Sequence, residues 1–357
     1  QVVPRGAPAA AHPPTPIQSA RCGMTKTLAF RVSKSKVNRI GPTAPSRRSV
    51  RDRCVVDRYV ARPAERPVAP VRYHLVPENG WNDHTRQLRC GMSNVIEWDG
   101  NLPLPAAPSS PCWLLPAKDD MALCISRLQH EIIAAGWKVL TCDEAVISRL
   151  SNKAKLSDYA KRLGMLTHLP AHYATPAEAR YPCLLKAAEG EHGQNIHIVH
   201  SAEEVRAVTT TGFGSTWLLE EMCDGSLELS VSLLVVAGEI LDAVCTEYEY
   251  DSEQYVWPHV GEVGRRSYDV GGGAAFQLEH LAVMKDFLHE YSGICNFNYK
   301  VRPNGRMCIF EVNTRVGADL ACDVPRPRAR ALFAKMDAVW EDIPASRSAS
   351  RWADEME

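Results

Sequence analysis

The feature that most constrains the fold is a pair of strand-like runs in the C-terminal part of the chain. Cys295 to Val301 and Met307 to Val312 are rich in apolar and aromatic residues, and Asn304-Gly305 lies in the short segment between them. Asn-Gly is a strong hairpin signal, because both residues tolerate the positive φ values that a tight turn needs. The two runs are therefore predicted to pair as antiparallel strands.

Oxygen-bearing side chains alternate along both runs. Alternate residues of a strand share a face, so Asn296 and Asn298 point one way, as do Glu311 and Asn313. Once the hairpin forms, these groups can meet, and oxygen ligands at that density suit Mg²⁺ bound together with nucleotide phosphates. The guanidinium group of Arg315 would lie beside those phosphates and could donate two hydrogen bonds to them. An ordinary hairpin with polar exposed positions is the alternative.

A second segment has the residues of a phosphate clamp. Tyr181 to Lys186 is predicted to be a strand that ends in a lysine, and a glycine-containing turn, Ala187 to Asn195, leads to another strand, Ile196 to Val199. Glycines let backbone N–H groups approach a phosphate closely, and the lysine adds a positive charge. Taken alone the pattern is weak, because two glycines in a hairpin turn are usually only a turn.

Strands and helices alternate in the middle of the chain. A strand at Trp113 to Leu115, a helix at Asp119 to Ala135 and a strand at Trp137 to Leu140 predict parallel strands joined by a right-handed crossover. A further helix is expected to begin with Ser151 as its cap and to end at Gly164. The other predicted elements are strands at Val71 to Val76, Ser93 to Trp98, Leu218 to Met222, Leu229 to Val236 and Glu239 to Thr246, and a helix at Leu278 to Tyr291.

In their order along the chain, these motifs resemble the ATP-grasp superfamily, and most closely the ATP-grasp domains of carbamoyl-phosphate synthetase. That superfamily shows an Asp-Lys that opens a helix, a Lys-Pro strand end, a glycine-rich loop, a Glu-Glu linker between two lobes and a Glu-x-Asn strand end. The corresponding places are held here by Asn152-Lys153, Lys186-Ala187, Glu189 to Asn195, Leu218 to Met222 and Glu311-Val-Asn313. The resemblance extends over roughly residues 112–340.

The resemblance implies an α/β and α+β architecture, the ATP-grasp fold, in which two α+β lobes hold ATP after a partial α/β pre-ATP-grasp domain. We expect a basic, proline-rich and disordered segment at residues 1–60, since no acidic residue accompanies the Lys and Arg side chains of residues 1–50. The expected domains are an N-terminal α/β region at 61–148, a small ATP-grasp lobe at 149–218, a C-terminal lobe at 219–340 and a polar tail at 341–357.

The resemblance also implies roles for individual residues. The metal ligands would be Asn298, Glu311 and Asn313, and the catalytic residues, which contact the phosphates, would be Asn296, Lys186 and Arg315. The ATP-binding residues would be Lys153, Lys186, Glu189, Gly190, Gly193, Glu220, Glu221, Met222, Glu228 and His259. The substrate carboxylate would pair with Arg265 and Arg266. A surface histidine is the alternative for His259, and a solvated loop is the alternative for the two arginines.

The implied activity is an ATP-dependent ligation. A small carboxylate would be activated as an acylphosphate and coupled to an amine, with ATP and Mg²⁺ or Mn²⁺ as cofactors and with ADP and phosphate as products. The alternatives are a carboxylate–thiol or carbamoyl-phosphate-type ATP-grasp enzyme and a catalytically weakened ATP-binding or interaction protein. The last is motivated by Asn298, where the family has Gln, Asp or Glu, and by Thr314, where it has Pro.

Composition argues against several other classes. The net charge of −1 over 357 residues does not favour a nucleic-acid binder, and no apolar run approaches the ~20 residues of a membrane-spanning helix. The 12 cysteines form no pair of Cys-x-x-Cys units, which favours reduced thiols and a cytoplasmic location over a zinc site or a disulfide framework. Organelle targeting by the basic N-terminal segment is the alternative. The expected partners are small molecules, and a homodimer is left open.

Overall fold

A computed structural model describes residues 72–76, 94–95, 98–107, 112–187, 196–209, 213, 217–256, 259–269 and 276–342. The chain divides into two units, Gln1–Asp57 and Arg58–Glu357, and every described residue belongs to the second. The predicted basic segment at 1–60 lies outside the described residues, as does the predicted tail from residue 343 onward. None of the described helices is long and apolar enough to cross a membrane.

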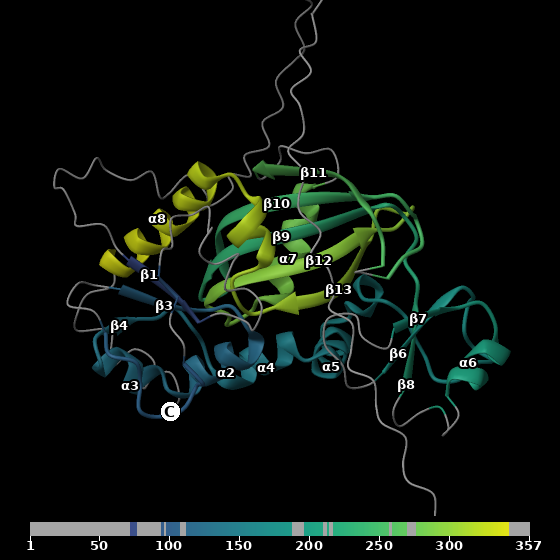
Figure 1. Cartoon of the computed structure of the whole chain (residues 1–357), viewed down its shortest axis with the longest axis horizontal. Coiled ribbons are helices and arrows are strands. Elements are labelled where there is room, and N and C mark those ends of the chain that lie inside the picture. Colours follow the sequence, from purple (N-terminus) through teal and green to yellow (C-terminus); the bar gives the residue numbers. More distant parts are fainter. Residues whose placement is uncertain are drawn as a thin grey trace, which may run out of the picture. The chain divides into compact units, whose positions relative to one another are not determined.

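The described part begins with a parallel sheet, as the crossover pattern predicts (Figure 1). Its strand order is β2-β1-β3-β4, and its strands are β1 (Arg72–Val76), β2 (Asn94–Val95), β3 (Cys112–Pro116) and β4 (Trp137–Lys138). The single helix predicted between β3 and β4 is wrong, because α2 (Asp119–Arg127) and α3 (Gln129–Ala134) are separate helices. Leu128 between them has φ −104° and ψ 19°, and the break lets Ile132 of α3 pack in the same buried cluster as Trp137.

Two consecutive helices, α4 (Glu144–Ser151) and α5 (Lys153–Leu163), follow this sheet. The prediction that Ser151 caps the second helix is wrong, since Ser151 is the last residue of α4 and donates a hydrogen bond to the Ile147 carbonyl at 3.1 Å. Asn152 is the cap instead, and its Oδ1 accepts from the backbone N–H of Lys155 at 3.1 Å. Gly164, with φ 71°, ends α5 as expected.

A small antiparallel sheet comes next, with strand order β5-β8-β6-β7. Its elements are β5 (His172–Tyr173), β6 (Cys183–Ala187), β7 (Ile196–Val199), α6 (Ala202–Val208) and β8 (Trp217–Glu221). This sheet has a core of its own, formed by Cys183, Leu185, Val199, Val205 and Leu219. It therefore packs as a separate lobe, from which β8 leads toward the larger sheet.

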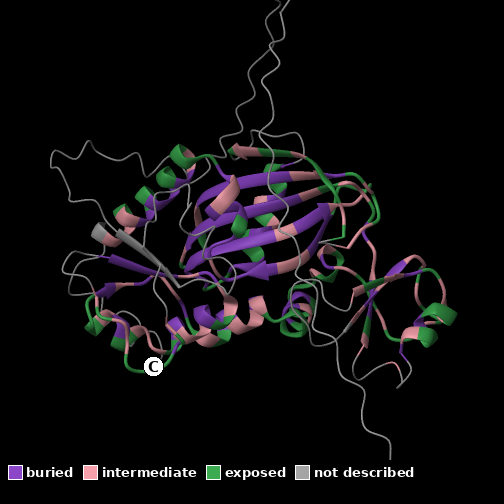
Figure 2. Ribbon diagram, viewed as in Figure 1, coloured by how far each residue is buried: buried purple, intermediate pink, exposed green. Residues whose placement is uncertain are grey.

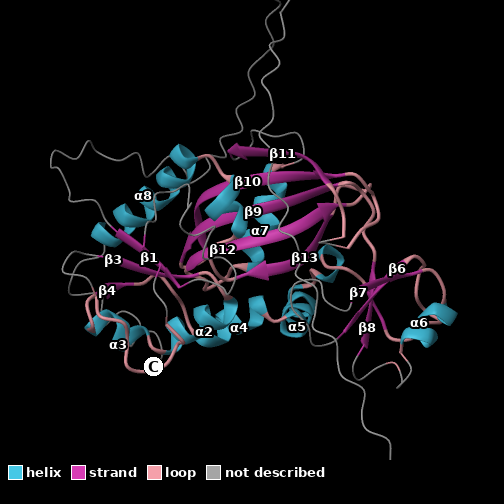
Figure 3. Ribbon diagram, in the orientation of Figure 1, coloured by secondary structure: helices cyan, strands magenta, loops and turns pink. Residues whose placement is uncertain are grey.

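The largest sheet is antiparallel and has the strand order β11-β10-β9-β12-β13 (Figure 3). Its strands are β9 (Leu227–Val236), β10 (Glu239–Tyr250), β11 (Glu262–Asp269), β12 (Gly293–Val301) and β13 (Met307–Asn313). The predicted hairpin of β12 and β13 is confirmed, with Asn296 opposite Asn313 and Asn298 opposite Glu311. The alternative of a solvated loop at Arg265 and Arg266 is wrong, because both residues lie in β11, an edge strand whose mixed polar sequence gave no clear signal.

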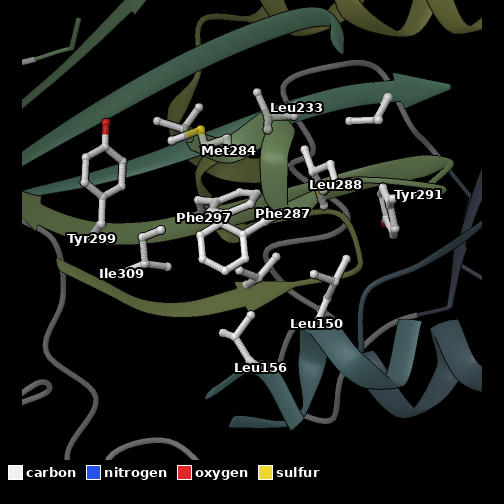
Figure 4. Close-up of a cluster of buried hydrophobic side chains, with 14 of the residues drawn as sticks. Leu150, Leu156, Leu233, Met284, Phe287, Leu288, Tyr291, Phe297, Tyr299 and Ile309 are labelled. Carbon is white, nitrogen blue, oxygen red and sulfur yellow. The ribbon is translucent and has the colours of Figure 1, made fainter. Parts of the chain in front are cut away.

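One face of this sheet carries the main hydrophobic core, to which β9 contributes Leu229, Val231 and Leu233 (Figures 2 and 4). Helix α7 (Leu278–Phe287) contributes Met284 and Phe287 to the same cluster. Strand residues alternate between faces, and Leu234, Val244 and Ile294 on the opposite face pack in a second apolar cluster with Leu320. Other positions of the opposite face carry polar side chains and are called the polar face below: Glu228, Ser230, Ser232, Asn296, Asn298, Glu311 and Asn313.

The C-terminal segment joins the largest sheet to the parallel sheet. After β13 come a single π-helical turn, Asp319–Asp323, and helix α8 (Arg326–Asp342). Leu332, Phe333 and Met336 of α8 pack in one cluster with Trp113 of β3. The parallel sheet is thereby fixed against the segment that follows β13.

We expect Phe287→Ala to destabilise the protein strongly. Phe287 is fully buried, and its ring meets that of Tyr159 edge to face at 6.3 Å between centroids. Removing a buried aromatic side chain leaves a cavity and costs about 3–5 kcal/mol. Urea unfolding would measure the loss, with Leu278→Ala as the control on the same helix because Leu278 is 56% exposed. Equal unfolding midpoints for the two variants would contradict this account of the core.

Candidate functional site

The three expected metal ligands are in direct contact where β12 lies beside the end of β13. Glu311 Oε1 accepts hydrogen bonds from Asn298 Nδ2 at 2.9 Å and from Asn313 Nδ2 at 3.1 Å. Each asparagine uses its NH₂ group here, and both contacts end on the same oxygen of Glu311. The two amide oxygens and Glu311 Oε2 therefore take no part in these contacts.

This donor set fits Mg²⁺ better than a structural metal. The described residues contain no group of three or more His, Cys, Asp and Glu side chains that could hold an ion. Mg²⁺, in contrast, is usually bound by one or two carboxylates and completes its octahedron with water and substrate phosphates. Glu311, Asn298 and Asn313 offer oxygen ligands of this kind. The chemistry of the residues thus fits the metal that the sequence implies.

The surroundings of the half-buried Glu311 favour its ionised form. Burial alone would raise its pKa, but the charges of Lys153 and Arg315 and the hydrogen bonds from the two asparagines outweigh it. The pKa of Glu311 therefore lies below its ordinary value. A carboxylate held in this state can bind a cation at neutral pH without first losing a proton.

Arg315 lies beside a residue that the sequence does not single out. Its Nε is 3.9 Å from Oδ2 of Asp119, the first residue of α2, and its Nη1 donates to the Val316 carbonyl at 3.3 Å. Asp119 Oδ1 also accepts from the backbone N–H of Thr314 at 2.7 Å and from its hydroxyl at 3.0 Å. The start of α2 thereby fixes the end of β13. The only sequence signal was an acidic first turn, which is common in helices.

A small pocket lies between α5, the small sheet and β13. Its lining residues are Lys153, Leu156, Leu169, Pro170, His172, Glu220, Ile309 and Phe310. Glu220 is buried, its carboxylate contacts the ammonium group of Lys186, and its Oε1 is 3.9 Å from His172 Nε2. Burial raises the pKa of Glu220, but the charge of Lys186 and the hydrogen bond from Lys186 lower it. His172 and Lys153 lower it by smaller amounts. Together the lowering effects outweigh burial, so the pKa of Glu220 lies below its ordinary value. The pocket thus combines apolar walls with a charged pair at its edge.

Glu221, next to Glu220, has a different environment. Its two carboxylate oxygens accept from Arg302 Nε at 2.9 Å and Nη2 at 2.8 Å, and one of them also accepts from the Ala171 backbone N–H at 3.0 Å. Arg302, in the β12–β13 turn, also donates to the carbonyls of Thr167, Leu169 and Met307. The Glu221 side chain thus ties β8 to the hairpin and is not among the residues that line the pocket.

We expect Arg302→Gln to lower stability because it removes this tie. The change leaves Glu221 without its bidentate partner and deprives the three carbonyl groups of a donor, at a cost of about 2–4 kcal/mol. Urea unfolding is the measurement. Arg306→Gln is the matched control, because Arg306 is exposed in the same turn. If the Arg302→Gln variant is as stable to urea as this control, the contacts of Arg302 with Glu221 and the three carbonyl groups do not contribute to stability.

Glu228 is half-buried and lies on the polar face in a second cluster, with Tyr255 and Lys300. Its Oε2 accepts from the Tyr255 hydroxyl at 2.8 Å. The buried Lys300 Nζ donates to the Cys223 carbonyl at 3.1 Å and lies 3.9 Å from the centre of the Tyr255 ring. Burial raises the pKa of Glu228, although the Tyr255 hydrogen bond and Lys300 oppose the shift. The Glu228 carboxylate is thus engaged by the Tyr255 hydroxyl in this structure.

The remaining expected site residues are dispersed or not described. Met222 is half-buried in the segment after β8, and His259 is exposed in the segment between β10 and β11. Arg265 donates to both Glu262 oxygens, at 2.8 and 2.5 Å, and Arg266 pairs with Glu247 at 3.2 Å. The two expected substrate residues are therefore already engaged by acidic side chains. The expected loop residues Glu189, Gly190 and Gly193 lie outside the described residues.

Asn296 lies at the centre of the polar face. Its Oδ1 accepts from Asn313 Nδ2 at 3.3 Å, and its Nδ2 donates to Ser230 at 2.8 Å and to Asp319 Oδ1 at 3.1 Å. Burial raises the pKa of Asp319 to about 7. Asp319 belongs to the π-helical turn and was not singled out by the sequence, because its partners lie far from it along the chain.

Comparisons with known proteins support the fold. No protein-family profile matches the sequence, and no curated protein does either. The structure is similar to D-alanine–D-alanine ligase from Bacillus anthracis, with a TM-score of 0.51 and 15% identity over 76% of this chain and 97% of that one. It is also similar to phosphoribosylamine–glycine ligase from Thermotoga maritima, with a TM-score of 0.51 and 17% identity over 75% of this chain and 76% of that one. The chain therefore has the ATP-grasp fold.

Proposed function

We propose that the protein is an ATP-dependent ligase that joins a small carboxylate to an amine. The observation that carries the proposal is the contact of Glu311 with Asn298 and Asn313, which brings three oxygen-bearing side chains together and uses the NH₂ groups of both asparagines and one oxygen of Glu311. The ATP-grasp fold and the names of two proteins that share it, both of them ligases, support the same reaction class. The closer resemblance to carbamoyl-phosphate synthetase stays a prediction.

ATP would lie in the pocket lined by Lys153 and Glu220. The apolar side chains of Leu156, Leu169 and Ile309 suit the faces of a nucleobase, and backbone groups of β8 could bind its edge. Lys153, Lys186 and Arg315 would offset the charge of the phosphates. Glu311, Asn313 and Asn298 would hold Mg²⁺, which when bound neutralises the charge that develops during phosphoryl transfer.

The reaction needs no nucleophilic side chain. An oxygen of the substrate carboxylate attacks the terminal phosphorus of ATP, the bond to the bridging oxygen breaks, and ADP leaves. The amine then attacks the carbonyl carbon of the acylphosphate, phosphate leaves with the bonding electrons, and the amine loses a proton. The protein acts by positioning the groups and by offsetting charge, which is the main contribution in phosphoryl transfer.

An ADP-release screen tests the proposal. Purified protein with ATP and Mg²⁺ would be supplied with carboxylates in combination with amines, with thiols as acceptors in a second arm and bicarbonate in a third. Release that depends on a carboxylate and an amine would support the ligase. Release only with thiols or only with bicarbonate would assign the protein to another ATP-grasp reaction.

A catalytically weakened ATP-binding protein is the second candidate. The neutral Asn298 and the engagement of the Lys186 ammonium by Glu220 favour it. Isothermal titration with ATP and Mg²⁺ separates the candidates, because binding without ADP release in any arm of the screen would support the weakened protein.

A further inference from the structure

Side-chain hydrogen bonds form a continuous chain from the expected metal ligands to Asp319. Asn313 donates to Asn296, and Asn296 donates in turn to Asp319 Oδ1. All three residues are buried, and Asp319 is 1% exposed. Asp319 is also bound by the Ser232 hydroxyl, at 2.9 Å from Oδ1 and 3.0 Å from Oδ2. The residues Asp319, Asn296 and Asn313 are called the amide relay below.

The amide relay has a direction that its chemistry imposes. An asparagine has an acceptor on one side of its amide and a donor on the other, whereas a carboxylate oxygen only accepts. Asp319 Oδ1 therefore attracts the NH₂ group of Asn296, which turns Asn296 Oδ1 toward Asn313. Asn296 Oδ1 attracts the NH₂ group of Asn313 for the same reason. The Asn313 carbonyl oxygen is thus left for a ligand on the open side.

Asp319 is the only part of the relay that can select this direction among the groups that contact Asn296 in the described structure. The Ser230 and Ser232 hydroxyls, 2.8 and 3.4 Å from Asn296 Nδ2, can each donate or accept and would serve either orientation. A proton on Asp319 Oδ2 would not reverse the direction, because Oδ1 would still accept from the Asn296 NH₂ group.

The backbone also packs closely against the relay. A Cβ added to Gly317 would collide with Asp319 Oδ1 and would lie 3.0 Å from the Asn296 amide. The glycine therefore allows the segment after β13 to approach Asn296 and to place Asp319 within hydrogen-bonding distance. This close approach leaves little space in which the Asn296 amide could turn.

We propose that Asp319 is a positioning residue that orients the Asn313 amide so that its oxygen faces the metal ion of the nucleotide complex. This inference rests on the proposed function, because it presumes that Asn313 is a metal ligand. The inference adds Asp319 to the functional residues, although Asp319 itself would contact neither the metal nor the phosphates. Asp319 acts on the metal only through Asn296 and Asn313.

The first test is Asp319→Asn, which keeps the shape of the side chain but can present either a donor or an acceptor to Asn296. Mn²⁺ binding in the presence of ATP, measured by electron paramagnetic resonance, should weaken by roughly 10- to 100-fold, the usual effect of changing a residue behind a metal ligand. Asp323→Asn is the matched control. Asp323 lies in the same turn but contacts Tyr248 and Arg265, and its change should leave Mn²⁺ affinity unaltered. Asp319→Ser provides a second variant with the same expected weakening.

The decisive test repeats Asp319→Asn in an Asn313→Asp background. A carboxylate at position 313 presents an oxygen in either orientation, so the relay has nothing left to orient. Asp319→Asn should then leave Mn²⁺ affinity unchanged or improve it, because a carboxylate at 313 attracts the Asn296 NH₂ group away from Asp319. An equal loss in both backgrounds would show a purely structural role and overturn the inference.

The outcomes separate this inference from the proposed function. If the unaltered protein does not bind Mn²⁺ with ATP, both are overturned. If it binds and Asp319→Asn binds equally well, only the relay is overturned. Unfolding midpoints for each variant identify any loss of affinity that comes from loss of the folded state.

Discussion

Glu311→Gln is expected to abolish ATP turnover while leaving the protein folded. Glutamine has nearly the same shape as glutamate and can still accept from Asn298 and Asn313 through its amide oxygen, so packing at the end of β13 is retained. It lacks the negative charge that binds a divalent cation and that Lys153 and Arg315 stabilise. We expect the rate of ADP release to fall by about three orders of magnitude.

The measurement is ADP release under saturating ATP and Mg²⁺, with the unfolding midpoint recorded in parallel. Glu279→Gln is the control, because Glu279 is an exposed carboxylate on α7. A Glu311→Gln protein that releases ADP at the parental rate would remove Glu311 from the metal site. It would leave the ATP-grasp fold unaffected, since the fold does not depend on this charge.

Arg315→Ala is the second change with a large expected effect. The guanidinium would contact the phosphates during transfer, and arginines in that role contribute about 10³- to 10⁵-fold to the rate. We expect kcat to fall by at least about 10³-fold and the affinity for ATP to change less, because the contact strengthens as charge develops. Arg330→Ala, an exposed arginine on α8, is the control.

Asp119→Asn is the informative partner of that experiment. Asparagine keeps an oxygen for the Thr314 backbone and hydroxyl but removes the negative charge near Arg315. The loss in kcat should therefore be much smaller than for Arg315→Ala. A loss as large as that of Arg315→Ala would mean that Asp119 itself contacts the reacting groups.

Local signals in the sequence predicted the hairpin that carries the site. Asn304-Gly305 predicts the turn between β12 and β13, and this turn sets the register from Val301 opposite Met307 to Tyr299 opposite Ile309. A β-bulge then shifts the register by one residue and places Asn298 opposite Glu311. The strand pairing depends on residues close together in the chain and could therefore be predicted, whereas no local signal marks the bulge that brings Glu311 onto the face of Asn298.

Contacts between distant segments could not be predicted in the same way. Asp119 meets Thr314 across 195 positions, and Asp319 meets Ser232 across 87. Neither aspartate belongs to a periodic pattern or a motif, so its role depends on how the sheets and helices pack. The ion pair of Arg265 with Asp323 could not be predicted for the same reason, because Asp323 lies on a turn that no local signal marked. The break at Leu128 is likewise a result of packing, because no glycine or proline interrupts the sequence there.

The adjacent residues Glu220 and Glu221 have a consequence for any movement between the lobes. Glu220 holds Lys186 within the small sheet, while Glu221 holds Arg302 of the hairpin in the large sheet. Both charge pairs therefore anchor the same short strand, one to each lobe. A movement of the small sheet away from the large sheet would therefore have to break the Glu221–Arg302 pair, while the Glu220–Lys186 pair could stay intact.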